Sequence, residues 1–491
     1  MSRSANSRWG DLMTRERPAV ERLAALSIDR AGEWVVSARP MPEELSAREV
    51  EQIATGLGLS ADFAYAPPHV FPMSVPRFLP EAGAEREAPA KGGFGVYVHV
   101  PFCNYGCTFC FYAKKVGAGR EVMSRYVAAV RRELEKIERG TQLTQLYVGG
   151  GTPTALPADL LDGVLDAVLG RMVQTPGIVH TVECSPESIT ADHLAVLRDR
   201  GVGRVSVGVQ SLNGAVLERI ARAHSASQAF AACDLLVASD RIVNVDLIYG
   251  LPGQTQESFR EDLAALASRG VDSFTLYNLR LNERTPVARA LADAERLNLT
   301  GLVRWRAFAK RAAEELGFVQ TRWHGFRRRD LPAWKAAFAD LTSTGDQFGA
   351  GNSARSRFGS TIYRNHASLE VYVERLATGG SPVEEVFRMD ENERKLRFVT
   401  LTLGDGACLD LAEYRRSFGG SFLEDFSEPV RRLAALGLLS QDPRQVFLTD
   451  TGKLVYDLAT LAFYPDSMRR WLGERRARTL SPRRDAIPAP D

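Results

Sequence analysis

The sequence predicts an α/β fold: a partial (β/α)6 barrel with an N-terminal extension and a mostly helical, winged-helix-like C-terminal domain. Two observations support this prediction. From Gly93 to about residue 320, short apolar runs alternate with amphipathic helical segments, and the alternation stops after that point. A repeated strand-then-helix pattern is typical of parallel βα units. About six units fit, fewer than the eight of a closed barrel, so we expect an open or partial barrel.

Each expected strand ends in a loop rich in polar or glycine residues. In chain order the strands are GVYVHV, LTQLYVGGG, HTVECSP, RVSVGVQS, IVNVDLIYGLP and SFTLYNL. Between them lie segments such as REVMSRYVAAVRRELEKIERG and SFREDLAALASRG, whose apolar residues recur at helical spacing. In such folds the chemistry lies at the carboxyl ends of the strands, because the loops converge there. We therefore expect the functional site at this end.

The regions outside the barrel are identified by their changes in composition. The predicted organisation is an N-terminal extension at 1–92, the barrel at 93–320, a connecting segment at 321–385, a winged-helix-like domain at 386–470 and a mobile tail at 471–491. The extension contains the Pro-rich run YAPPHVFPMSVPRFLP, and we expect it to wrap the larger body. The C-terminal module has mixed charges, which favours a packing or lid role over DNA binding.

The overall composition is that of a soluble globular protein. The 491 residues are 45% hydrophobic with a formal net charge of +2, so no general affinity for nucleic acid is expected. No stretch reaches the roughly 20 apolar residues of a membrane span. The N-terminus, MSRSANSRWGDLMTRERP, lacks the apolar run of a secretory signal. We therefore expect a cytoplasmic protein with neither a membrane nor a nucleic-acid partner.

Three cysteines are clustered directly after the first strand. Cys103, Cys107 and Cys110 lie within eight positions, whereas six cysteines in the whole chain are too few for a disulfide framework. A structural zinc site usually takes four ligands, and no second cysteine pair exists. Three thiolates suit an iron-sulfur cubane, which then keeps one iron open for a substrate or cofactor.

The remaining candidate ligands are isolated in the sequence. Cys184, Cys233 and Cys408 lie in strand or helix patterns, where we expect buried free thiols. His99 lies within the first strand, and we expect it to serve packing rather than metal binding.

The CxxxCxxC spacing at the mouth of a βα barrel resembles the radical S-adenosylmethionine (SAM) superfamily. The run YVGGGTPT at 147–154 is similar to the glycine-rich strand end of that family, although without the cysteines it would indicate only a tight turn. The resemblance implies a radical SAM barrel with a [4Fe-4S] cluster held by the three cysteines. SAM would bind the open iron, and its reductive cleavage would yield a 5'-deoxyadenosyl radical.

Within the superfamily, the chain resembles the group around oxygen-independent coproporphyrinogen III oxidase. The motifs are YVHVPFC, VECSPESIT, SVGVQSLN and VDLIYGLPGQT, so 93–320 match closely and GAGNSARS and LTDTGKLVYDLATLAF match more weakly. The resemblance implies that SAM contacts residues in all of these motifs. The implied cofactor-binding residues are Tyr97, Gly149, Gly150, Gly151, Thr152, Glu183, Gln210, Arg222 and Asp246. Carboxylates suit an ammonium group and ribose hydroxyls, while Arg and Gln suit a carboxylate; surface ion pairing is the alternative reading.

Two departures separate this chain from the oxidases themselves. The oxidases usually carry a further cysteine two residues after the third, where this chain has Tyr112 in CTFCFYAKK. The closing helix, GKLVYDLATLAFYP, also lacks the arginine expected there. We therefore favour a class C methyltransferase or cyclopropane-forming enzyme acting on an sp2 carbon, a class that uses two SAM molecules.

Other members of the group provide the alternatives. The alternative functions are oxidative decarboxylation of a porphyrinogen, opening of the heme ring with methyl transfer, and heme binding by a chaperone that does not turn over substrate. The resemblance also implies a small-molecule substrate and an electron donor such as flavodoxin or ferredoxin. In the methyltransferase reading, the loop with Arg280 and Glu283 would face the second SAM.

Overall fold

Six parallel strands form the centre of the fold. In this computed structural model the described residues are 26–28, 34–36, 45–58, 79–80, 84–86, 92–282, 285–291, 297–338 and 345–480. The six strands neighbour one another in sequence order: β4 (Phe94–Val100), β7 (Gln142–Gly150), β9 (His180–Cys184), β10 (Val202–Gln210), β11 (Ile242–Tyr249) and β12 (Ser273–Asn278). The predicted partial (β/α)6 barrel is confirmed.

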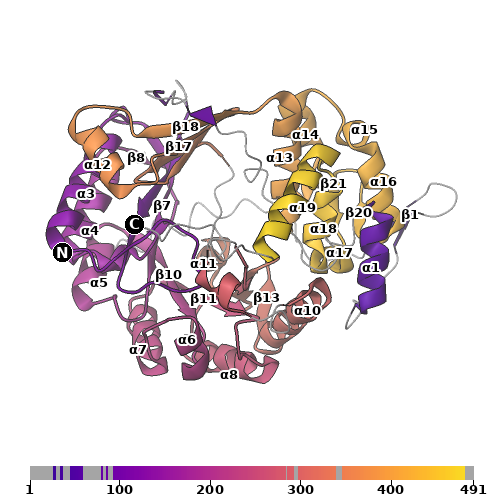
Figure 1. The fold of residues 1–491 in the computed structure, drawn as a ribbon, viewed down its shortest axis with the longest axis horizontal. Helices are drawn as coiled ribbons and strands as arrows, with labels where there is room; N and C mark the ends of the chain where they lie inside the picture. The colour runs from indigo at the N-terminus through magenta and orange to yellow at the C-terminus, as the bar shows by residue number, and fades with distance from the viewer. Residues whose placement is uncertain are drawn as a thin grey trace, which may run out of the picture.

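Helices on the outer side connect these strands (Figure 1). They are α3 (Arg120–Leu134), α4 (Ala158–Leu169), α5 (Ala191–Asp199), α6 (Gly214–Arg219), α7 (Ala226–Val237), α8 (Gln256–Ala267) and α10 (Leu299–Glu315). Local sequence defines where they begin: Ser225 with Gln228, and Thr255 with Ser258, form capping boxes at α7 and α8. Each helix therefore starts just after a strand-end loop, which leaves those loops together at one end.

The central sheet is extended on both edges. Strand β15 (Gln347–Ala350) pairs parallel with β4, and β16 (Arg355–Phe358), β17 (Thr361–Asn365), β18 (Val383–Arg388) and β3 (Leu79–Pro80) follow it antiparallel. On the other edge β14 (Gly325–Arg328) and β13 (Phe318–Gln320) pair antiparallel. Much of the segment 321–385, expected only to connect domains, thus belongs to the barrel sheet. These strands are short and carry arginines, so the hydrophobic pattern did not reveal them.

The barrel sheet has an apolar outer face, which packs against the helices, and a polar inner face. Alternate residues of β4, Val96 and Val98, are almost fully buried against the helices, while Tyr97 between them is partly exposed on the inner side. The same alternation places Tyr147 of β7 and Glu183 of β9 on the inner face. Polar residues therefore line the barrel interior.

The C-terminal part is mostly helical with a small sheet. Its helices are α13 (Glu391–Gly404), α14 (Leu411–Phe418), α15 (Phe422–Asp425), α16 (Ser427–Ala435), α17 (Asp450–Leu454), α18 (Tyr456–Leu461) and α19 (Asp466–Leu480). The strands β19 (Leu409–Asp410), β21 (Gln445–Leu448) and β20 (Leu439–Gln441) form an antiparallel sheet in that order. This arrangement agrees with the winged-helix-like prediction.

Described pieces of the N-terminal extension contact both parts of the molecule. Helix α1 (Ala47–Gly56) lies beside the C-terminal helices (Figure 1), and its Val50 and Ile53 share their hydrophobic core. Strand β3 pairs with β18 at the far edge of the barrel sheet. Arg86 forms a buried ion pair with Glu133 of α3. No helix in the described part of the chain is long and apolar enough to cross a membrane.

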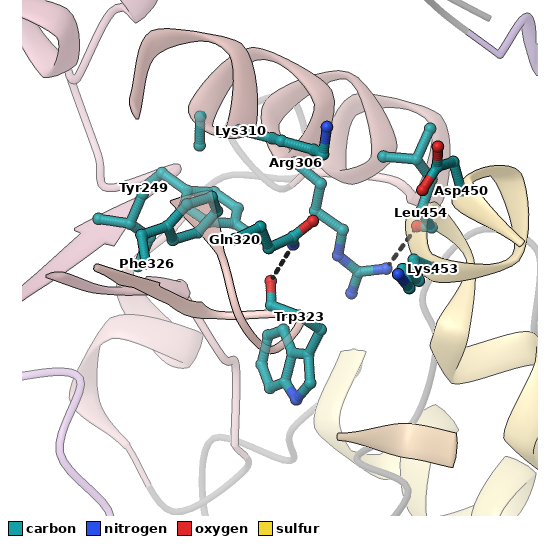
Figure 2. Close-up of a pocket in the computed structure, with 11 residues that line it drawn as sticks. Tyr249, Arg306, Lys310, Gln320, Trp323, Phe326, Asp450, Lys453 and Leu454 are labelled. Atoms are coloured by element: carbon teal, nitrogen blue, oxygen red, sulfur yellow. Dashed lines mark hydrogen bonds between the residues drawn. The ribbon is translucent and has the colours of Figure 1, made fainter. Parts of the chain in front are cut away.

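A buried ion pair joins the barrel to the C-terminal domain. Arg306 of α10 donates to Asp457 at 2.5 Å and to the Leu454 carbonyl at 2.9 Å, and its guanidinium lies 4.3 Å from the Tyr456 ring centre. Figure 2 shows Arg306 and Lys310 on α10 facing Lys453, Asp450 and Leu454, with a small pocket between them. The two parts therefore form one packed unit at this junction.

Candidate active site

The cysteine loop is anchored at the carboxyl end of the barrel. It follows β4 and begins with β5 (Phe102–Cys103), which pairs with β6 (Lys115–Val116). The Thr108 amide donates to the Ile220 carbonyl at 3.0 Å, and the Val287 amide donates to the Thr108 carbonyl at 3.1 Å. The loop is thus held by the connections that follow β10 and β12.

The three clustered thiols lie close enough to influence one another. Burial raises the pKa of Cys103 to about 11; the Thr152 hydroxyl 3.9 Å away lowers it, and Cys110 and Cys107 raise it further. Among the described residues, no three His, Cys, Asp or Glu side chains are grouped to hold a single metal ion. A cubane binds each thiolate at a different iron atom, and three thiols converging from one loop are a suitable donor set for it.

The isolated cysteines differ from the expectation in one case. Cys184 and Cys233 are buried, as expected for structural thiols, but Cys408 is exposed. Cys408 lies in the loop between α13 and β19, which the strand-like sequence pattern did not reveal.

The glycine-rich strand end packs tightly against the cysteine loop. A Cβ on Gly149 would lie 2.6 Å from a Glu183 oxygen, and one on Gly151 would lie 2.7 Å from the Phe102 carbonyl. Gly150 has a φ of +114°, and a Cβ there would meet the His99 ring. The Thr152 amide donates to the Phe102 carbonyl at 2.8 Å. Glycine is therefore required because protein atoms already fill the side-chain positions.

Glu183 is held at this glycine-rich end. Its carboxylate accepts hydrogen bonds from the Tyr147 hydroxyl at 2.6 Å and from the Gly150 amide at 3.0 Å. Burial raises the pKa of Glu183, whereas the Tyr147 hydrogen bond lowers it and the Asp246 charge raises it. The carboxylate is thus oriented by two donors on the inner face of the barrel.

Asp246 occupies the same inner face two strands away. It accepts hydrogen bonds from Ser206 at 3.0 Å and from the Asn244 amide at 2.8 Å. Burial raises the pKa of Asp246, while the Arg204 charge lowers it. The Arg204 charge also lowers the pKa of Glu183, so one buried cation favours the ionised form of both carboxylates.

Gln210 and Arg222 lie where β10 ends. Gln210 has a φ of +71°, beside an irregularity in the ladder between Gly208 and Gln210. A left-handed conformation at a glutamine is strained and is typical of functional sites. Arg222 donates to the Gly208 carbonyl and places Nη1 3.3 Å from the Cys107 sulfur. The structure thus brings Arg222 to a cluster cysteine.

Tyr97 is oriented by His99, for which only packing was expected. The Tyr97 hydroxyl lies 3.1 Å from His99 Nδ1, and His99 Nε2 lies 3.0 Å from the Ala113 carbonyl. Because a carbonyl oxygen can only accept a hydrogen bond, Nε2 carries the proton. Burial lowers the pKa of His99 and so favours the neutral ring. In that neutral ring Nδ1 accepts the hydrogen bond from the Tyr97 hydroxyl. His99 therefore connects Tyr97 on the inner face of the barrel to Ala113, which follows the last cysteine of the loop.

Several residues of this site were missed by sequence reasoning. They are Tyr147, Arg204, His99, and the pair Tyr105 and Glu187, whose side chains hydrogen bond at 3.0 Å beside Arg222. The sequence signal that could have identified Tyr147 and Arg204 is the alternation of side chains along each strand, which places both residues on the inner face. Glu283 lies outside the described residues, whereas the Arg280 guanidinium lies 5.5 Å from the Trp323 ring centre, near the domain junction.

Comparisons with known proteins agree on one family. A family model described as the radical SAM superfamily matches residues 97–266. The chain is 31% identical to the heme chaperone HemW of Mycobacterium tuberculosis, over 75% of this chain and 95% of that one. It is 27% identical to the oxygen-independent coproporphyrinogen III oxidase of Escherichia coli, over 83% and 94%. The solved structure of coproporphyrinogen III oxidase (HemN) from Escherichia coli, described as a radical SAM enzyme, superposes with a TM-score of 0.69 at 25% identity, covering 81% and 96%.

Proposed function

Because this chain belongs to the radical SAM superfamily, in the group of oxygen-independent coproporphyrinogen III oxidase and HemW, we propose that Cys103, Cys107 and Cys110 are its cluster ligands. Membership of this family implies a [4Fe-4S] cluster and SAM, and makes the chain a radical SAM enzyme with a HemN-like structure. When bound by these cysteines and reduced, the cluster would supply the electron for the cleavage of SAM to methionine and a 5'-deoxyadenosyl radical.

The inner-face residues would bind and orient SAM. Glu183 keeps lone pairs beyond those used by Tyr147 and Gly150, and these suit an ammonium group. Asp246 is likewise oriented by Ser206 and Asn244, and suits ribose hydroxyls. We assign the polar end of SAM to these carboxylates and to Gln210 and Arg222, with Tyr97 and the backbone from Gly149 to Thr152 beside them.

For the reaction itself, we propose methyl transfer to an sp2 carbon of a small molecule, as such or followed by ring closure to a cyclopropane. The observation that supports this choice is Tyr112. It occupies the position of the oxidases' further cysteine, two residues after Cys110, and the residue is 57% exposed. This reaction needs a second SAM as methyl source, and an external electron donor such as flavodoxin or ferredoxin.

Oxidative decarboxylation of coproporphyrinogen III is the second candidate. It is favoured by the likeness to the oxidase of Escherichia coli, which covers 83% of this chain and 94% of that one. The likeness to HemW gives the same kind of support to heme binding without turnover.

A labelling experiment and a hemin titration together separate these three functions. Reconstituted, reduced protein is given SAM deuterated on its methyl group, with an acceptor substrate or with coproporphyrinogen III. Methyl transfer should place deuterium in 5'-deoxyadenosine and release S-adenosylhomocysteine, because the radical takes its hydrogen from the methyl group of the second SAM.

The opposite outcomes identify the alternatives. Decarboxylation of coproporphyrinogen III with no deuterium in 5'-deoxyadenosine would establish the oxidase. Tight hemin binding in a titration, with no SAM cleavage under reduction, would establish heme carriage.

A further inference from the structure

Glu133 of α3 is a fully buried carboxylate whose two oxygens each accept two hydrogen bonds. The donors are the Arg86 guanidinium, the Asn365 side-chain amide at 2.8 Å, the Gly351 backbone amide at 2.9 Å and the hydroxyl of Tyr372 on α12 (Leu369–Ala377). An ionised carboxylate only accepts hydrogen bonds, and it has about four lone pairs for them. Glu133 therefore carries a buried negative charge that separate segments of the chain hold in place.

Arg86 supplies the positive charge for this carboxylate, and it comes from the N-terminal extension. Its side chain is 5% exposed. Burial lowers the pKa of Arg86 to about 10, so the guanidinium stays protonated at neutral pH. Its other terminal nitrogen donates to the Gly349 carbonyl of β15 at 2.9 Å and to the Ser356 hydroxyl of β16 at 3.2 Å. Arg86 therefore connects α3 to the strands that extend the barrel sheet.

Helix α3 also holds the end of β4. About two helical turns before Glu133, the Tyr126 hydroxyl donates to the His99 carbonyl. Gly351 lies against the same carbonyl, since its φ is +100° and a Cβ there would lie 2.5 Å from the oxygen. The strands that end near these residues, β4 and β15, are parallel neighbours. Helix α3 thus holds the His99 carbonyl and the Gly351 amide together.

The main chain around His99 carries both ends of the cysteine loop. The loop begins after β4, and the His99 ring places Nε2 3.0 Å from the Ala113 carbonyl, beyond the last of the three cysteines. The Lys115 amide donates to the Pro101 carbonyl at 2.7 Å, which closes the loop at its base. A shift of the end of β4 would therefore move both ends of the loop.

We infer that Arg86 is a positioning residue for the cysteine loop: through Glu133 it holds α3, and α3 holds the main chain from which the loop starts. Without Arg86, the Glu133 charge would be buried and unpaired, and α3 would have to move or admit water. The proposed function gives the extension no role. This inference rests on the proposed function only for what the loop would bind.

The test measures hydrogen–deuterium exchange of the segment 101–117 in the full-length protein, before and after reconstitution with a cluster. Arg86→Met keeps the aliphatic bulk but removes the charge. It should speed exchange in this segment about two- to thirtyfold, the range found for residues that couple distant sites. Arg86→Lys should lie between Arg86→Met and the wild type, because a single ammonium group cannot serve Glu133 and Gly349 as the forked guanidinium does. Arg86→Lys also decides the question if Arg86→Met does not fold.

Two control variants separate positioning from other effects. Lys136→Met breaks an exposed ion pair with Glu85, the residue directly before Arg86, at 3.0 Å. Arg306→Met breaks a buried ion pair at the domain junction and so controls for a general loss of stability. Both controls should leave exchange in 101–117 unchanged.

Three outcomes would overturn the inference. They are unchanged exchange of the loop in the Arg86 variants, an equal rise in Arg306→Met, and a wild-type loop that exchanges at the rate of an unprotected chain. In reconstituted samples, iron loss to a chelator should be about two- to thirtyfold faster in Arg86→Met than in either control. A wild type that never binds a cluster refutes the proposed function but leaves the role of Arg86 standing, because exchange is also measured without a cluster.

Discussion

Arg222 Nη1 lies 3.3 Å from the sulfur of Cys107, although 115 positions separate the two residues. The same guanidinium donates to the Gly208 carbonyl and lies 5.1 Å from the Tyr105 ring centre. Burial alone would lower the pKa of Arg222, but Cys107, Tyr105 and Glu187 raise it. The end of β10 and the cysteine loop therefore form one unit, in which a permanent cation faces a thiol that must become a thiolate to bind iron.

The cluster ligands can be tested one at a time. Replacing Cys103, Cys107 or Cys110 with Ala should remove the cluster and all SAM cleavage, because each thiolate holds a different iron atom. Iron and sulfide contents after anaerobic reconstitution provide the measurement. Cys408→Ala is the control, since this thiol is exposed and away from the loop. A Cys103→Ala protein that keeps four irons and four sulfides would refute the assignment.

Asp246→Ala should weaken SAM binding without removing the cluster. The change deletes a partly buried carboxylate that Ser206 and Asn244 orient, and a charge-assisted contact is worth about 1.5–3 kcal/mol, or roughly ten- to a hundredfold in affinity. Calorimetric SAM titration and the visible spectrum measure the two effects separately. Asp272→Asn alters a buried carboxylate at the opposite end of the strands, bonded to the Val243 amide at 2.9 Å, and should leave SAM affinity unchanged. Unchanged affinity in Asp246→Ala would count against the pocket.

Asp262 should make stability depend on pH. It accepts a hydrogen bond from Ser211 at 2.7 Å, next to Gln210, and burial raises its pKa to about 6. The folded state keeps this proton to higher pH than the unfolded state, so its contribution is full below about pH 4 and is lost as the pH rises through 6. The loss amounts to about 3 kcal/mol at most.

Asp262→Asn removes this titration but keeps an acceptor for Ser211. The free energy of unfolding of the wild type, relative to this variant, should fall between about pH 4 and 7, as measured by urea titration. A difference that stays constant over this range would show that Asp262 is ionised in the folded protein throughout.

The junction between the barrel and the C-terminal domain depends on Arg306 and Asp457. Arg306→Met leaves a buried carboxylate unpaired and should lower the free energy of unfolding by about 3–5 kcal/mol. The double variant Arg306→Met, Asp457→Leu should be more stable than the single one, because no buried charge remains. Urea unfolding of the three proteins tests this. Equal stability of wild type and Arg306→Met would mean that the pair does not hold the junction.

Much of the barrel could be predicted because its pattern is local. The six parallel strands follow from short apolar runs that alternate with amphipathic helical segments, and both signals lie within a few residues. The edge strands β15 to β18 could not be predicted in this way. Their partners are far away in the chain, as in the pairing of Gln347 with Gly95, and their mixed residues show no clear alternation.

The sequence by itself determined the family: the spacing of Cys103, Cys107 and Cys110 and the motifs around Glu183 and Asp246 are sufficient to identify it. Only the tertiary structure decided how these residues are supported. Tyr147 of β7 donates to Glu183 on the neighbouring strand β9, and His99 joins Tyr97 to the cysteine loop. It also decided that Arg355, from a segment expected to be a connection, lies on β16 of the barrel sheet. The physical reason is that motif spacing records contacts along the chain, whereas the register of the sheet determines which distant side chains share its inner face.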